Sequence, residues 1–136
     1  GFTRGYHRRT GGDTSGFRKL DITACSTLEQ ARRAAHDSNF GNTDCAVPML
    51  WATENDIDAD AFVILTDNET WAGDIQPTQA LDAYRKKTGI NASLSVVGMT
   101  STGFTISDPY DPRQMDFVGF STDTPRVLAD FVRGDI

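Results

Sequence analysis

The sequence has only two cysteines and no apolar run of membrane-spanning length. Cys25 and Cys45 are too few for a disulfide scaffold and lack the spacing of a metal site. Apolar runs such as residues 61–65 fall far short of the roughly 20 residues that a membrane span needs. No charged segment followed by an apolar one opens the chain, as a signal peptide would. We therefore expect a domain with no membrane partner and a reduced, cytoplasmic location.

Basic residues are also scarce. The 136 residues include 19 acidic and 13 basic side chains, which gives a net charge of −6. A domain whose main task is to grip nucleic acid needs clustered Lys and Arg, so the composition argues against that class. Residues 1–20 are the exception, with a net charge of +4 and many glycines. We interpret them as a basic loop or edge hairpin that discourages aggregation, or as an arm that contacts nucleic acid or a partner. A second basic run, residues 85–87, is interpreted as the exposed end of a helix.

Predicted strands alternate with predicted helices along one domain, residues 1–136. Strands are expected over 17–22, 61–65, 92–99 and 117–120, and helices over 26–37, 45–53, 77–88 and 125–132. Ser26 and Glu29 match a capping box at the start of the first helix. Residues 61–65 show no alternation of apolar and polar side chains, as expected for a strand covered on both faces. The pattern predicts an α/β fold with a mostly parallel sheet.

Oxygen-bearing side chains follow the predicted strand 61–65. They are Thr66, Asp67 and Glu69. In parallel α/β sheets, ligands bind outside the carboxyl ends of the strands, and hard oxygen donors favour Mg²⁺, Mn²⁺ or Ca²⁺. Asp67 is therefore a candidate cation ligand. The alternative is that its carboxylate only caps the backbone of its own turn.

Four segments resemble, in order, the Ro ribonucleoprotein autoantigen family. They are residues 41–49 (GNTDCAVPM), 65–70 (LTDNET), 84–87 (YRKK) and 97–106 (VGMTSTGFTI). The similarity runs from about residue 20 to the end. It is to the C-terminal von Willebrand factor A-like domain of that family, which follows an RNA-binding ring of helical repeats (the TROVE module). The resemblance implies a Rossmann-like fold with a mostly parallel sheet.

The resemblance also implies a metal-ion-dependent adhesion site (MIDAS). In the family pattern, two serines of an Asp-x-Ser-x-Ser loop, a threonine and an aspartate hold a divalent cation. The threonine corresponds to Thr43 and the aspartate to Asp67, with Asp44 and Glu69 expected at the rim. Mg²⁺ suits such a site because it keeps several waters and needs few carboxylates. An acidic side chain of a protein partner would take the open position.

The Asp-x-Ser-x-Ser segment has no counterpart in this sequence. In the family it follows the first, central strand, whereas residues 1–3 here resemble the end of the second strand. The resemblance therefore implies a domain that lacks the first strand and helix of the fold. A cation site without the serine loop is expected to be weak or absent.

Three functions are compatible with these observations. The resemblance implies a non-catalytic interaction domain of a protein that binds small noncoding RNA through its helical ring and acts in RNA quality control. Residues 62–70 also loosely resemble the D-x-D-x-T motif of haloacid-dehalogenase-like phosphotransferases, in which Asp67 would be the nucleophile and Mg²⁺ would neutralise the phosphate. The third function is a metal-free structural assembly domain, which the missing serine loop favours.

Overall fold

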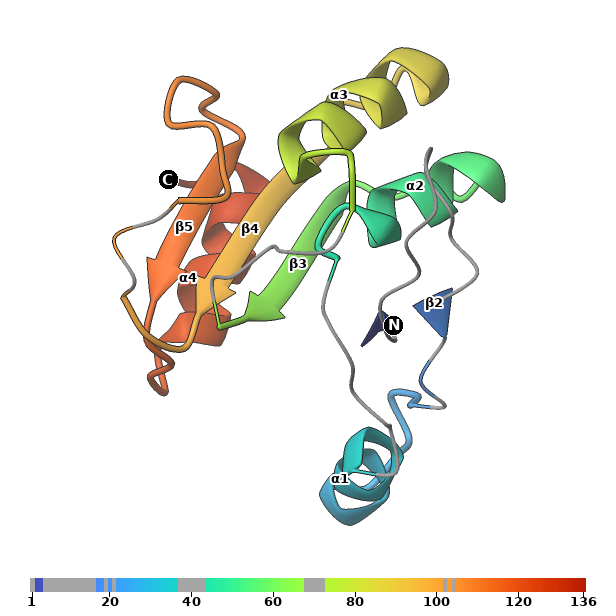
Figure 1. Ribbon diagram of the computed structural model, residues 1–136. Helices are drawn as coiled ribbons and strands as arrows, with labels where there is room; N and C mark the ends of the chain where they lie inside the picture. The colour runs from blue at the N-terminus through green and yellow to red at the C-terminus, as the bar shows by residue number, and fades with distance from the viewer. Residues whose placement is uncertain are drawn as a thin grey trace.

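The chain is built from short strands and helices, with two strands and two helices preceding the main sheet (Figure 1). The computed structural model describes residues 2–3, 17–18, 20, 22–36, 44–67, 73–101, 103 and 105–136. Its elements are, in order, β1 (Phe2–Thr3), β2 (Phe17–Arg18), α1 (Leu28–His36), α2 (Val47–Glu54), β3 (Ala61–Thr66), α3 (Pro77–Thr88), β4 (Ser93–Gly98), β5 (Gln114–Val118) and α4 (Thr124–Arg133). Among the described residues, no helix is both long enough and apolar enough to cross a membrane.

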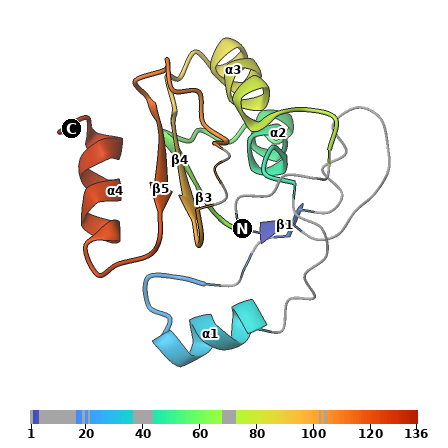
Figure 2. The same ribbon diagram turned by 60° about the vertical axis from the view of Figure 1, so that its left-hand side comes forward.

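Three parallel strands form the main sheet, in the order β3-β4-β5. Thr66 lies beside Gly98, and Gly98 lies beside Val118, so the strands end level at one edge. Figure 2 shows α2 and α3 on one face of this sheet and α4 on the other. Because both faces are covered, all six residues of β4 are buried. The predicted mostly parallel α/β sheet is confirmed.

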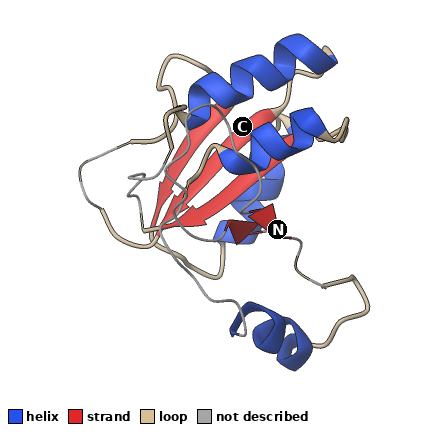
Figure 3. Cartoon of the chain, turned by 45° about the vertical axis from the view of Figure 1, so that its right-hand side comes forward, coloured by secondary structure: helices blue, strands red, loops and turns tan. Residues whose placement is uncertain are grey.

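The N-terminal strands form a separate antiparallel pair, in which Phe2 faces Arg18. Phe17 packs against Trp51 of α2, with ring centroids 4.9 Å apart. This agrees with a hairpin in the first 20 residues, although residues 4–16 lie outside the described part. Helix α1 stands apart from the sheet (Figure 3) and has no buried residue.

The core lies between the sheet and helices α2 and α3. Its buried residues are Cys45, Ala46, Met49, Ala52, Phe62, Ile64, Ala80, Leu81, Tyr84, Ala92, Leu94, Val96 and Ile106. The Tyr84 ring meets Phe62 edge-on at 5.0 Å. The Tyr84 hydroxyl donates to the Ile57 carbonyl at 2.9 Å and accepts from the Ala59 N–H at 2.7 Å. One buried phenol therefore ties α3 to the loop that enters β3.

The capping box of α1 begins one residue later than predicted. Thr27 Oγ1 accepts from the Gln30 N–H at 3.2 Å, and Gln30 Oε1 accepts from the Thr27 N–H at 2.8 Å. Ser26 instead accepts a hydrogen bond from the Thr23 N–H, and Glu29 pairs with Arg32. The two candidate motifs are offset by one residue and satisfy the same kind of free amide, so local sequence alone does not separate them.

Strand β3 is not covered on both faces, which corrects the prediction from its apolar run. Ile64 is buried, whereas Val63 and Leu65 are 49% and 58% exposed. Within the described residues, β3 pairs only with β4. The ladder begins and ends at the carbonyls of Asp60 and Thr66, and alternate residues of a parallel strand bond to the same neighbour. Val63 and Leu65 therefore expose their side chains on the face opposite α2 and α3, and their backbone groups point away from β4.

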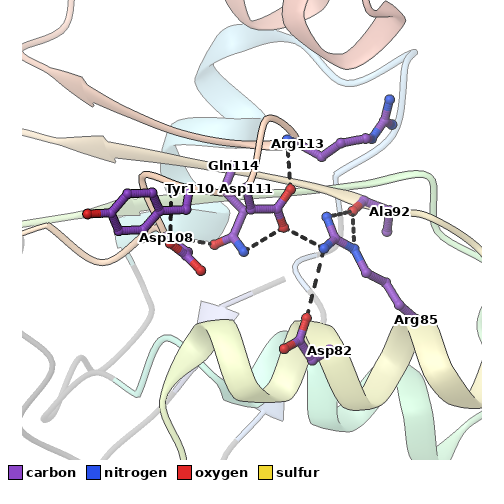
Figure 4. Close-up of polar contacts among 8 residues, drawn as sticks. All are labelled: Asp82, Arg85, Ala92, Asp108, Tyr110, Asp111, Arg113 and Gln114. Carbon is purple, nitrogen blue, oxygen red and sulfur yellow. Dashed lines mark hydrogen bonds and ion pairs between the residues drawn. The ribbon is translucent and has the colours of Figure 1, made fainter.

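The prediction that residues 85–87 form an exposed basic run is wrong for Arg85. Only 16% of the Arg85 side chain is exposed. Its guanidinium donates to the Ala92 carbonyl at 2.9 and 2.7 Å and pairs with Asp111 at 2.5 Å (Figure 4). Asp111 also accepts from the Gln114 side chain and the Arg113 N–H, both at 2.9 Å. Burial acts to raise the pKa of Asp111, but these hydrogen bonds hold that pKa below its usual value. The network fixes α3 to the start of β4 and to the loop before β5.

The last strand also lies earlier than predicted. It covers Gln114–Val118 rather than 117–120. Gly119 follows with a φ of +81°, a conformation that suits glycine and ends the strand.

Tyr84→Phe removes the buried hydroxyl and keeps the ring. We expect the free energy of unfolding to fall by about 1–3 kcal/mol, because the Ala59 N–H loses its buried partner. Urea denaturation measures this change. Tyr110→Phe is the matched control, since Tyr110 is 93% exposed and the same substitution should cost nothing there. Equal effects at the two positions would contradict the assigned role of Tyr84.

Asp111 should make stability depend on pH. Because its folded-state pKa lies below the ordinary value of 3.8, its ionised form stabilises the fold above that pH, and the contribution is lost as the pH falls through the folded-state pKa. Asp111→Asn should cost about 1–3 kcal/mol at neutral pH and less in acid. Urea unfolding of both chains at neutral pH and at about pH 3 measures the cost of the substitution under each condition. A cost that does not shrink in acid would contradict the ionic role.

Candidate metal centre

Acidic side chains gather at the edge where the parallel strands end. Asp67 directly follows Thr66, the last residue of β3, and is exposed. The Thr66 hydroxyl donates to Asp67 Oδ1 at 3.3 Å. This is the position that the sequence predicted for a ligand-binding carboxylate, since the carboxyl ends of parallel strands share one edge.

Asp44 lies in the same corner, three residues before α2. Its Oδ1 accepts a hydrogen bond from the Ala46 N–H at 2.9 Å. Gly73 packs directly against the carboxylate: a Cβ at that position would lie 2.2 Å from Asp44 Oδ2. Gly73 also has a φ of +105°, which suits glycine. The missing side chain of Gly73 is therefore what makes room for Asp44.

Burial and neighbouring negative charges raise the pKa values of Asp44 and Cys45. Burial raises the pKa of Asp44, the Ala46 N–H opposes the shift, and the negative charge of Asp74 adds to it. Burial likewise raises the pKa of the Cys45 thiol to about 11, with Thr66 acting against this and the charges of Asp44 and Asp67 adding to it. Asp44 and Asp67 thus act on the same thiol. Like charges in a partly desolvated corner are relieved by a bound cation or a proton.

The structure brings two of the four predicted residues together. Asp67 and Asp44 share the corner, whereas Thr43 and Glu69 lie outside the described residues. In the described ranges, no group of three or more His, Cys, Asp or Glu side chains could hold a metal ion. The candidate metal ligands among the described residues are the two carboxylates and the Thr66 hydroxyl. These hard oxygens suit Mg²⁺ in kind, but they form only part of a coordination shell.

Sequence reasoning missed Asp74 and its neighbour Gly73. Both lie in the connection from β3 to α3, after the motif that drew attention to Asp67. The available signal was a glycine beside an acidic residue in a loop that leaves the ligand-binding edge. Their closeness to Asp44 depends on residues about thirty positions apart in the chain, which no local pattern reveals.

Comparisons with known proteins assign the fold. The sequence model of one family, described as the Ro60 vWA domain, matches residues 7–132. The RNA-binding protein RO60 of Deinococcus radiodurans is 49% identical over 88% of this chain, and that of Caenorhabditis elegans is 40% identical over 87%. The chain spans only 23% and 18% of these two relatives.

A solved structure agrees with the sequence matches. The crystal structure of the Deinococcus radiodurans RO (RSR) protein matches with a TM-score of 0.81 and 48% identity, over 90% of this chain and 25% of that one. The family resemblance and the α/β fold predicted from the sequence are both confirmed. The chain belongs to the Ro60 vWA domain family.

Proposed function

We propose that this chain is a non-catalytic interaction domain of a Ro60-type RNA-binding protein. Its two relatives named above are both RNA-binding RO60 proteins, which supports the RNA-binding context. The net charge of −6 supports a division of labour in which a helical-repeat ring of the same protein holds the RNA. The whole protein would bind small noncoding RNA and serve RNA quality control. Two unpaired cysteines support a cytoplasmic location, since thiols stay reduced there.

The proposed interaction is adhesion through a divalent cation at the edge of the sheet. The observations that support this proposal are pairwise: the charge of Asp74 acts on Asp44, and the charges of Asp44 and Asp67 both act on the Cys45 thiol. A partly buried carboxylate such as Asp44, with other negative charges nearby, is unfavourable unless a cation or proton meets it. Asp67 and Thr43 would hold Mg²⁺, with Asp44 and Glu69 at the rim. The bound ion would supply an electrophilic position for a carboxylate of a protein partner.

Within this proposal the described residues have separate tasks. Asp67 offers an exposed carboxylate at the end of β3. Asp44 is held by the Ala46 N–H and adds negative charge from the side. Gly73 leaves space for it. None of these residues has to move a proton or break a bond, so the chemistry that they supply is binding.

Mg²⁺ should stabilise the folded chain. An ion that binds only the folded state raises the free energy of unfolding by about 1.4 kcal/mol at ten times its Kd. Thermal unfolding in millimolar Mg²⁺ and in excess EDTA measures the effect. Asp67→Ala should abolish it, whereas Asp123→Asn, which changes an exposed carboxylate between β5 and α4, should retain it.

Asp44→Asn tests whether the negative charge of Asp44 destabilises the fold when Mg²⁺ is absent. The amide oxygen can still accept from the Ala46 N–H, and the unfavourable buried charge disappears. We expect the variant to be as stable as the parent chain in EDTA, or more stable, but to gain less from Mg²⁺.

Two other results would favour the alternatives. A cooperative transition that ignores Mg²⁺ would contradict the cation site and favour a metal-free assembly domain. Hydrolysis of a generic phosphate ester that is lost in Asp67→Asn would favour the phosphotransferase.

A further inference from the structure

The loop before β5 presents an apolar projection to solvent. Pro109, Tyr110 and Pro112 are all exposed, and Tyr110 is 93% exposed. We refer to these three residues as the Tyr110 knob. In Figure 4 the Tyr110 ring points away from the polar network around Arg85. An aromatic side chain gains nothing from such exposure in the isolated domain, because its burial would be favourable.

Hydrogen bonds hold the knob in a fixed shape. Asp108 Oδ1 accepts from the Tyr110 N–H at 2.9 Å, and the Asp108 carbonyl accepts from the Asp111 N–H at 3.2 Å. The Asp108 N–H donates to the Gln114 side chain at 3.0 Å. The two prolines have restricted φ angles, and the Arg85–Asp111 pair secures the base of the loop. A rigid loop loses little entropy on binding, and an exposed tyrosine on such a loop is typical of an interface anchor.

The charged side chains around the knob are mainly acidic. Arg113, which follows Pro112, is the exception, and Figure 4 shows its side chain extending away from Tyr110. Asp108 adjoins Tyr110, and Asp82, whose side chain is 60% exposed, lies at the base of the loop near Arg85. The positive charge of Arg85 is already paired with Asp111. These carboxylates would repel a phosphate backbone and complement a surface that carries Lys or Arg. Charge therefore favours a basic protein surface over RNA as the occupant.

We propose that the Tyr110 knob docks this domain onto the remainder of the Ro60-type protein, with the Tyr110 ring in an apolar pocket rimmed by basic residues. The inference rests on the proposed function, since it takes the chain as one domain of such a protein. The chain spans 23% of its Deinococcus relative. An RNA-binding protein needs a basic surface, and this acidic domain is not its main source. The knob precedes β5, at the opposite end of the sheet from Asp67, so docking leaves the proposed cation site open.

Hydroxyl-radical footprinting of the full-length protein tests the docking. Mass spectrometry compares the oxidation of Tyr110 and Tyr84 in the native protein with their oxidation in denaturant. Tyr84 is fully buried and marks the level of complete protection. We expect Tyr110 in the native protein to be oxidised as slowly as Tyr84. Oxidation of Tyr110 at its denatured rate, with Tyr84 protected, would overturn the proposal. Protection that appears only when RNA is added would also overturn it, in favour of an RNA contact.

A charge reversal tests the basic rim. Asp82→Lys keeps a good helix former at an exposed position of α3 and should weaken docking, so that the undocked fraction measured by Tyr110 oxidation rises by roughly tenfold. Asp123→Lys reverses an exposed carboxylate at the other end of the sheet and is the matched control. Equal oxidation of Tyr110 in the two variants would contradict the attraction between Asp82 and a basic rim. Repeating the footprint in EDTA separates the proposals, since a failed cation site leaves the protection of Tyr110 unchanged.

Discussion

The burial of β4 on both faces is the constraint that the other elements satisfy. Every residue of this strand is buried, so it needs α2 and α3 on one side and α4 on the other. Its entrance is fixed by the two hydrogen bonds from Arg85 to the Ala92 carbonyl. Because the same guanidinium holds Asp111, one side chain sets both the start of β4 and the loop before β5. The level strand ends, and with them the corner at Asp67, follow from that alignment.

Features with local causes could be predicted from the sequence, and features with distant causes could not. Helix α3 was predicted with both of its ends, since Pro77 and Gly89 are local start and stop signals. The place of Asp67 followed from the rule for parallel strands. The partner of Arg85 is 26 residues away, and the uncovered face of β3 depends on which neighbours the strand has. Neither is written into a short window of sequence.

Two partly buried aspartates, Asp111 and Asp44, illustrate how similar chemistry produces opposite outcomes. The carboxylate of Asp111 has donors from Arg85, Gln114 and the Arg113 backbone, and its pKa is lowered. Among the described residues, Asp44 accepts a hydrogen bond from the Ala46 N–H and has a second carboxylate nearby, and burial together with that charge raises its pKa. The first arrangement is complete and serves the fold. The second sets a partly desolvated carboxylate beside a like charge, and the proposed cation site depends on that arrangement.

The contrast between the two thiols makes the chain selectively reactive. Cys25 is exposed, whereas Cys45 is 1% exposed and has a pKa of about 11. Since the thiolate is the nucleophile, a maleimide reagent at neutral pH should modify Cys25 and spare Cys45. Cys25 lies three residues before α1, the helix that stands apart from the sheet. The native sequence therefore carries its own attachment point for a fluorophore or spin label that reports the distance between this helix and the core.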